Sequence, residues 1–468
     1  MEALPGLLLL LGTPAALGAC CACVLGLRAR EDVPAFAAKA WLLGAFLLAA
    51  LLFLGLVAGV PLPVLRWVPP GALAILVPWA LRARRDRPAT AAARRPGHGL
   101  WLAVTAACLL ATIDRIVRAD EAIVCFSDEG HIWNVKARAI WEGGGFTPEF
   151  RALVSEPDAP APQLTFPHRD YPLQNPLLQL WSFLCAGDVT LWQCRLVIQP
   201  FALALILLLA AALRRVAPPV VAAAAVALVA LSGSFQAACE TATADMMVAF
   251  GLCASLDAWS RYRAAGERRH LAVFAISLAS LAWSKNEGMV LAGLAGAACV
   301  ATDFRAAGSG RTARMLALLP AATVIVGQAA FNAWCDVHSD ILAVTPQGSF
   351  LTRVATQAAA NLPVIGRYLL EVGVLQPRAT NLVPLLAVAA FVLFPVRLLR
   401  RMPAATLTLL GAAAAYLVVY LGTPRFVDWH LQFSLDRVLL HVTPLAALWL
   451  AAAVATLWRP ERVHERLE

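Results

Sequence analysis

Two adjacent acids, Asp128 and Glu129, open the most chemically varied run of an otherwise apolar chain, residues 127–141. Carboxylates this close perturb each other's ionisation, which suits a general base beside an acid that orients the substrate or binds a metal. We therefore expect both acids to be catalytic. The structural alternative is helix capping, because Ser127 or Asp128 can cap a helix that the following glycines end.

The run 127–141 has the pattern of a short amphipathic helix. At 100° per residue, one face carries Trp133, Ala137, Ile140 and Trp141, and another carries His131, Asn134 and Arg138. This pattern predicts a helix that lies at a membrane surface. Its polar side chains His131, Lys136 and Arg138 are candidates for substrate binding.

A second polar cluster is the segment 168–172, with the sequence HRDYP. Pro172 keeps Tyr171 extended, and neighbouring prolines stiffen the loop. A rigid loop near a membrane surface can present His168, Asp170 and Tyr171 to a substrate. A solvated turn is the simpler interpretation.

Glu240 and Asp245 stand at the start of an apolar run at 244–260. The helix dipole favours acids at this place, so a purely structural role is sufficient to explain them. The short loop before the run is equally suited to a further acid of an active site. We expect Asp245 to be catalytic and Glu240 to contact the substrate.

Lys285 and Glu287 interrupt two short apolar runs in the sequence SKNEG. They can neutralise each other at the interface, or Lys285 can point at a phosphate near the lipid headgroups. Near the C-terminus, Arg437 can bind a phosphate with two parallel hydrogen bonds. His430 follows Trp429 and is either a substrate contact or part of an interfacial anchor. Basic groups beside several acids indicate a lipid phosphate as substrate.

The composition places all these residues in a membrane protein. Of 468 residues, 60% are hydrophobic and 14% are charged, which is too apolar for a soluble globular protein. Apolar runs of bilayer-spanning length recur throughout, so we expect an all-α, polytopic bundle of about 13 transmembrane helices. The predicted spans are 5–27, 41–60, 67–82, 99–116, 190–213, 218–236, 244–260, 271–285, 287–303, 315–334, 380–397, 404–421 and 437–458. A further apolar stretch at 361–375 is interfacial or re-entrant.

The net charge of +9 comes from arginines in short loops, where it indicates orientation and not nucleic-acid binding. The loops concerned are 28–39, which includes Lys39, and 82–98, and those that carry Arg214 and Arg215, Arg261 to Arg269, Arg305 to Arg314, Arg397 to Arg401 and Arg459 to Arg466. They are alternate connections, so they can all be cytoplasmic, with the N-terminus outside and the C-terminus inside. The first apolar run has no basic residue before it and is expected to be a retained helix. The 11 cysteines lie mostly in apolar runs and are expected to act as small hydrophobes.

This orientation leaves nearly all the other chemically capable residues on the outer face of an inner (plasma) membrane. Ionisable groups at membrane depth are costly and usually functional, so a one-sided site follows. The longest non-membrane stretch is the outer loop 117–189, which is long enough for amphipathic surface helices but too short for a nucleotide-binding domain. We divide the chain into N-terminal helices (1–98), a catalytic membrane module (99–458) and a cytoplasmic tail (459–468).

The chain resembles the integral-membrane glycosyltransferases of the GT-C fold. The closest likeness is to the bacterial branch of protein O-mannosyltransferases and aminoarabinose transferases (family 39 type). The resemblance covers about 120–440 and is carried by Asp128-Glu129, HRDYP at 168–172, Ala244-Asp245-Met246, SKNEG at 284–288 and WHLQFSLDR at 429–437. Two features depart from the family: three spans precede the one leading into the first outer loop, and no soluble domain follows the last span.

The resemblance implies a polyprenyl-phosphate-linked sugar as donor and inverting attack by an acceptor that is a lipid, glycan or protein. Asp128 would be the base, and Lys285 and Arg437 would stabilise the departing lipid phosphate. The resemblance also leaves room for a divalent cation at Glu240 or Asp245; no other cofactor is indicated, and metal ligands stay unassigned. Two other classes remain: a transporter or flippase of a lipid-linked sugar, which should show internal repeats and polar groups at both faces, and a non-catalytic membrane scaffold.

Overall fold

The computed structural model describes residues 3–85, 98–119, 128–155, 168–303, 311–372, 376 and 379–458. Every regular element in these ranges is a helix, so the predicted all-α class is confirmed. The N-terminal part comprises α1 (Ala3–Val24), α2 (Val33–Val57), α3 (Leu62–Leu65), α4 (Val68–Arg85), α5 (His98–Arg118), the π-helix η2 (Glu129–Asn134), α6 (Val135–Glu142), α7 (Pro148–Ser155), α8 (Gln174–Ala186), α9 (Leu191–Ile198), α10 (Pro200–Val216), α11 (Pro219–Ala230) and α12 (Gly233–Cys239). Ser127, residues 86–97 and the tail 459–468 lie outside the described residues.

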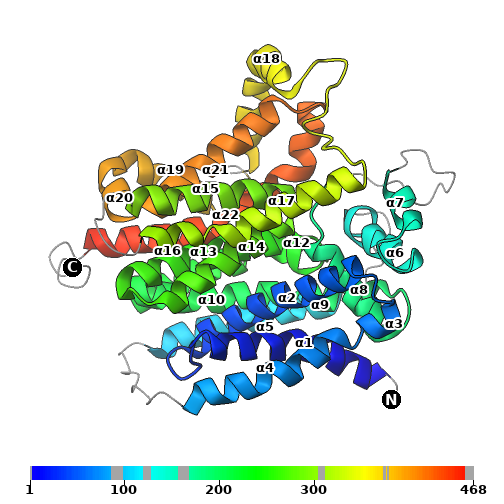
Figure 1. The fold of residues 1–468 in the computed structure, drawn as a ribbon. Coiled ribbons are helices and arrows are strands. Elements are labelled where there is room, and N and C mark those ends of the chain that lie inside the picture. Colours follow the sequence, from blue (N-terminus) through cyan, green and yellow to red (C-terminus); the bar gives the residue numbers. More distant parts are fainter. Residues whose placement is uncertain are drawn as a thin grey trace.

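The C-terminal part continues with α13 (Asp245–Ala265), α14 (Arg268–Ser284), α15 (Asn286–Asp303), α16 (Arg311–Leu316), α17 (Leu319–Trp334), α18 (Phe350–Leu370), α19 (Val383–Leu393), α20 (Pro395–Arg401), α21 (Pro403–Leu421) and α22 (Val427–Trp458). Most of these helices run side by side along one direction (Figure 1). The N-terminus lies at the end of this bundle that also carries α3, α6 and α7, and the C-terminus lies at the other end.

Eight helical stretches of the described chain are long and apolar enough to cross a membrane, or up to 10 if two bent pairs each count as one span. The molecule is therefore a polytopic helical membrane protein. The bent pairs are α11 with α12, at 61°, and α19 with α20, at 101°. Three further predicted spans correspond to α13, α14 and α15, which are shorter or more polar than the other eight.

α13 lies at the centre of the bundle and packs against α10, α14, α15 and α22. Its first fifteen residues, from Asp245 to Trp259, are all buried. Other helices cover α13 on every side, so its side chains contact protein and not lipid. Charged residues at its two ends can therefore find partners on the neighbouring helices. The site described below is built around its first residue.

The contact between α1 and α2 depends on two glycines. A Cβ atom on Gly18 would lie 1.7 Å from the carbonyl oxygen of Ala40, and one on Gly44 would lie 1.8 Å from that of Pro14. Only hydrogen fits at these two positions, so the backbones approach as closely as small residues permit in membrane helix pairs.

The segment 117–189, predicted to be an outer loop with surface helices, is in part more buried than predicted. The segment 174–186, which we assigned to this loop, is the helix α8, and twelve of its thirteen residues are buried. Its polar side chains are satisfied internally: Gln174 bonds Ser280 (3.0 Å), and Asn175 donates to the carbonyl of Ala242 (2.9 Å). Surface helices were expected in this loop, but the burial of α8 was not, because it depends on these internal partners for the polar side chains.

The predicted surface helix at 127–141 is a π-helical turn, η2, that runs into α6. Trp133, Ala137 and Ile140 are buried as expected, but Asn134 is also buried and bonds Gln179 at 3.2 Å. The assumed rotation of 100° per residue does not hold through a π-helical turn, so Asn134 faces inward. Asp128 makes no side-chain capping bond to this helix, which leaves its carboxylate available elsewhere.

An ionic network closes the end of the bundle opposite to α6 and α7. Asp257, near the end of α13, is 2.8 Å from Lys39 and 3.2 Å from Arg261, and is also paired with Arg215. Asp32 adds a second carboxylate, 3.2 Å from Arg261. Arg269 pairs there with Glu31. Three of the loops whose basic residues indicated orientation, 28–39, 214–217 and 261–269, therefore meet at one end of the bundle.

The stretch at 361–375 belongs in part to α18, which projects from the top of the bundle in Figure 1 and packs against α21 and α22. Arg353 in its first turns is fully buried and donates to the carbonyls of Gly422 (2.9 Å) and Gly348 (2.8 Å). Several leucines of α18 are exposed, as expected for an interfacial or re-entrant helix.

Candidate active site

The carboxylate of Asp245 is the centre of a buried ionic cluster. Its Oδ1 accepts hydrogen bonds from Lys285 Nζ and from His441 Nε2, both at 2.9 Å. Its Oδ2 accepts from Arg437 Nε at 2.9 Å. Asp245 is 1% exposed, so three donors from two other parts of the chain hold this anion away from water. A buried charge is tolerated only when it is paired and hydrogen-bonded in this way.

Arg437 extends the cluster to the surface, because it also binds the carboxylate of Asp128. The Arg437 side chain is 25% exposed and that of Asp128 is 47% exposed. Charges therefore alternate from the buried Lys285 through Asp245 and Arg437 to an exposed carboxylate. Asp128 is the member of this series that an external molecule can reach most easily.

Lys285 lies at the buried end of the cluster. It bridges Asp245 and Glu287, which is 3.0 Å away, and its own side chain is 5% exposed. This position differs from a contact with lipid phosphate at the surface: the ammonium group holds Asp245 in place. Gly288 permits the tight turn here, since a Cβ on it would lie 2.2 Å from the carbonyl oxygen of Leu281.

The two predicted acids of the pair have separate surroundings. Glu129 is 6% exposed and forms a two-bond fork with Arg195, at 2.8 and 2.9 Å. It also accepts from the backbone N–H of Ala242 at 3.0 Å. Glu129 thus ties η2 to α9 and to the segment before α13, a structural role, whereas Asp128 faces Arg437.

The predicted substrate contacts of α6 and η2 are also mainly structural. Lys136 is 1% exposed and donates to the carbonyls of Arg169 (2.8 Å) and Tyr171 (2.6 Å). Burial lowers the pKa of Lys136 to about 8, although the charge of Asp170 opposes this shift. Arg138 pairs with Glu142 on the same helix at 2.7 Å, and His131 is half-buried.

Glu240 and His430 lie outside the Asp245 cluster. Glu240 is paired with Arg115 of α5 at 2.9 Å, and both side chains are well exposed. His430 Nδ1 is 2.8 Å from the hydroxyl of Thr423. The structure therefore brings together Asp128, Asp245, Lys285, Glu287 and Arg437 of the predicted residues.

The HRDYP segment forms a second polar cluster beside the first. His168 Nδ1 is 3.2 Å from Asp340, and Asp340 also pairs with Arg425 at 2.8 Å. Asp170 Oδ2 accepts from Asn286 at 2.6 Å. Because Asn286 directly follows Lys285, one turn of the SKNEG motif connects the Asp245 cluster with the His168 cluster.

The local surroundings set the ionisation of this second cluster. Burial and the charge of Asp340 raise the pKa of Asp170 above its ordinary value. Burial alone would raise the pKa of Asp340 too, but the bonds to His168 and Arg425 outweigh it and hold this pKa at about 2. The ring of Tyr171 stacks on His168 with centroids 4.7 Å apart and lies 5.8 Å from Lys285 Nζ. Burial raises the pKa of Tyr171 well above its ordinary value.

Four residues of the two clusters were missed from the sequence: Asn286, Asp340, Arg425 and His441. His441 could have been found, because it lies four residues after Arg437 and so on the same face of α22. Asp340 gave no comparable signal, since it lies in a polar loop far from the other residues along the chain. Tyr416 supports His441 from α21 with a 2.9 Å contact to Nδ1.

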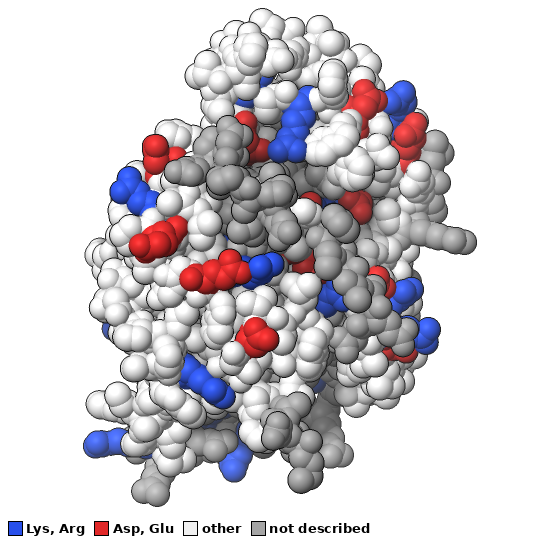
Figure 2. Space-filling model, turned by 90° about the vertical axis from the view of Figure 1, so that its right-hand side faces the viewer, with Lys and Arg blue, Asp and Glu red and all other residues white. Residues whose placement is uncertain are grey.

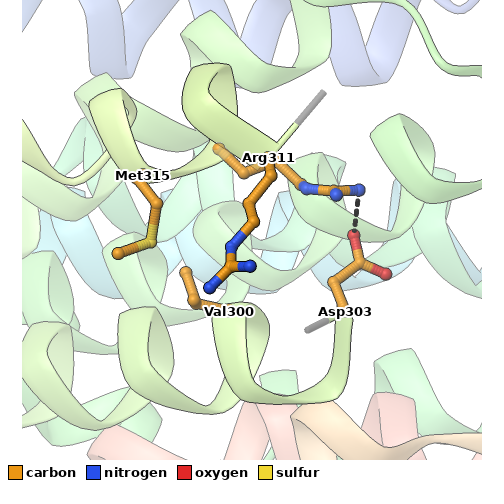
Figure 3. Close-up of a pocket in the computed structure, with 5 residues that line it drawn as sticks. Val300, Asp303, Arg311 and Met315 are labelled. Atoms are coloured by element: carbon orange, nitrogen blue, oxygen red, sulfur yellow. Dashed lines mark hydrogen bonds and ion pairs between the residues drawn. The ribbon is translucent and has the colours of Figure 1, made fainter. Parts of the chain in front are cut away.

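Figure 2 looks onto the end of the molecule that carries α6 and α7, and acidic and basic side chains alternate there over a mostly uncharged face. A separate hollow between α15 and α16 is lined by Val300, Asp303, Arg311 and Met315 (Figure 3). Asp303 there is ion-paired with Arg314 at 2.9 Å and with Arg263. This hollow begins at the far end of α15 from Asn286, so it does not belong to the Asp245 cluster.

Comparison of the chain with protein-family models, with curated proteins and with solved structures found no match.

Proposed function

We propose that the protein is a membrane glycosyltransferase that moves a sugar from a polyprenyl-phosphate-linked donor to an acceptor lipid, glycan or protein. The observation that carries this proposal is the contact of the exposed Asp128 carboxylate with Arg437, which the buried Asp245 holds from behind. A base and a phosphate-binding cation then lie side by side at one end of a membrane bundle. The finer parts of the proposal are a GT-C fold with 13 spans and a site on the extracytoplasmic face.

The proposed reaction uses the exchange of one ion pair for another. The donor phosphate takes the place of the Asp128 carboxylate on Arg437, because a guanidinium binds either group with two parallel hydrogen bonds. Asp128 is thereby released to accept the proton of the acceptor hydroxyl or amine. The acceptor atom attacks the anomeric carbon with inversion, and the bond from that carbon to the phosphate oxygen breaks. The lipid phosphate leaves with the electron pair, stabilised by Arg437.

In this mechanism Asp245 and Lys285 are positioning residues. Asp245 fixes the Nε side of the Arg437 guanidinium, so that its other nitrogens point toward Asp128. Lys285 and His441 keep Asp245 charged and immobile. A cation that is already oriented costs little reorganisation when charge develops on the departing phosphate.

The test is a transfer assay with the purified chain in liposomes, a panel of radiolabelled polyprenyl-phosphate sugars and an envelope extract as acceptor. Wild type should form a labelled product, while Asp128→Asn and Arg437→Gln should not. Asp428→Asn is the matched control, because Asp428 forms an exposed ion pair with Arg367 outside the cluster. Equal product from wild type and Asp128→Asn would refute the assignment of the base. Movement of labelled lipid across the bilayer without any product would indicate a flippase instead.

A further inference from the structure

Three side chains of the His168 cluster, one buried and two half-buried, are of the types that bind metal ions. His168 and Asp170 come from the turn before α8, and Asp340 comes from the loop between α17 and α18. One donor atom from each residue lies within 4.8 Å of the other two. Bound to one first-row metal at about 2.0 to 2.2 Å, such atoms would be roughly 3 to 3.6 Å apart, so a movement of about 1 Å closes the site. His168 Nδ1 and Asp340 are already 3.2 Å apart.

An unsatisfied carboxylate oxygen lies in this cluster. Asp170 is 3% exposed, and its Oδ1 has no hydrogen-bond partner among the described residues. The Oδ1 of Asn286, on the same amide that binds Asp170 Oδ2, is also buried without a partner there. Both atoms are acceptors, so neither can satisfy the other. A buried acceptor without a donor destabilises the fold, and a bound cation would remove this cost.

Other cations in the neighbourhood do not fill this position. Lys136 donates to two backbone carbonyls, and Arg169 donates to those of Val154 and Ser155 at 3.1 Å. Arg425 donates to Oδ2 of Asp340 at 2.8 Å. The carboxylates of Asp170 and Asp340 thus lie close together, and Arg425 is ion-paired with Asp340. A metal ion beside Oδ1 of Asp170 would balance the charge of the second carboxylate.

The donor set indicates which ion binds. Calcium and magnesium prefer sites made entirely of oxygen, whereas an imidazole beside two carboxylates suits zinc or manganese. The side chains of His168 and Asp340 are 17% and 33% exposed, so an ion can enter from the aqueous side. We propose that His168, Asp170 and Asp340 bind one first-row divalent metal ion, next to the Asp128–Arg437 pair. This site is distinct from the Asp128–Glu129 pair and from Glu240 and Asp245, the residues at which the sequence suggested a cation.

The test uses the full chain, purified in detergent, stripped with a chelator and titrated calorimetrically with Zn²⁺. Wild type should bind one ion per chain. Asp340→Ala and His168→Ala should weaken this binding by at least about 100-fold, the upper end of what loss of an outer partner of a metal ligand costs. Asp428→Ala, which removes an exposed carboxylate elsewhere, should bind like wild type. None of these readouts depends on sugar transfer, so failure here and failure of the proposed function are separate outcomes.

A second measurement guards against misfolded variants. Zn²⁺ should raise the thermal unfolding temperature of wild type and of Asp428→Ala, but not that of Asp340→Ala or His168→Ala, whose unfolding must remain cooperative. X-ray absorption of the zinc complex should show nitrogen and oxygen ligands. A folded wild type that binds no Zn²⁺, a variant that binds it equally well, or a sulfur-ligated ion would each overturn the proposal.

Discussion

The buried pair of Asp245 and Lys285 allows a quantitative test of the cluster. Their charged atoms are 2.9 Å apart, and the side chains are 1% and 5% exposed. Loss of one partner from such a pair costs about 3 to 5 kcal/mol, since the other charge stays buried. Asp245 keeps two donors, Arg437 and His441, when Lys285 is replaced. We therefore expect Lys285→Met to lower the free energy of unfolding by about 3 kcal/mol, the lower end of this range.

Asp245→Asn should cost a similar amount, because Lys285 and Arg437 each lose one of two carboxylate partners. The double variant removes both charges at once and should cost less than the sum of the single variants. We expect a coupling free energy of about 2 kcal/mol, within the range for side chains in direct contact. The control is the exposed pair of Arg367 and Asp428, for which we expect less than about 1 kcal/mol.

The assay is equilibrium unfolding in mixed micelles with increasing sodium dodecyl sulfate, followed by tryptophan fluorescence. The chain has 14 tryptophans, several of them in the core, so the signal should report global unfolding. The reasoning is refuted if the effects of Asp245→Asn and Lys285→Met add to within about 0.5 kcal/mol, as independent sites do. In that event, the short distance between them would not correspond to an interaction that stabilises the fold.

The remaining predictions concern structural roles and orientation. Glu129→Gln should lower the unfolding temperature, because the two-bond ion pair with Arg195 is lost. The protein that stays folded should keep its transfer activity. A loss of activity at unchanged stability would return Glu129 to the catalytic site. Lys136→Met leaves two buried carbonyls without their donor and should cost about 2 kcal/mol of unfolding free energy, measured in the same micelles; no change would show that these bonds contribute nothing. Asp428→Cys and Arg268→Cys are made separately in a background without other cysteines and treated in intact cells with a membrane-impermeant thiol reagent. Only Asp428→Cys should be labelled. Labelling of Arg268→Cys would reverse the proposed orientation.

The sequence could predict that four of the site residues share one end of the bundle, while the side of the membrane stays a prediction. Asp128, Asp245, Lys285 and Arg437 are far apart along the chain, yet counting arginines in alternate loops assigned them to one end, and they meet there. The pairing among them was beyond sequence reasoning, because it depends on how the ends of α13, α14 and α22 pack. The same limit explains why Lys285 was expected at the surface and is buried.

Local irregularity was the main source of error. Asp128 and Glu129 are neighbours and were expected to work together, but a π-helical turn begins at Glu129 and the two carboxylates find different arginines. No feature of the sequence distinguishes such a turn from an ordinary helix start. The burial of α8 was not predicted for a related reason: its glutamines and asparagine suggest exposure unless their buried partners are known.

The charges at the two ends of α13 have a consequence for how the bundle assembles. Asp245 and Asp257 are separated by 12 residues, or about 18 Å of helix. Each is held by basic side chains from other elements. Apolar side chains pack about equally well against many apolar neighbours, so apolar packing alone fixes the position of a helix along the bundle axis only weakly. Sliding α13 by a single turn, about 5.4 Å, would break the ionic contacts at both ends together. The two acids therefore fix the position of the central helix along the bundle axis. They also fix the level at which Arg437 meets Asp128.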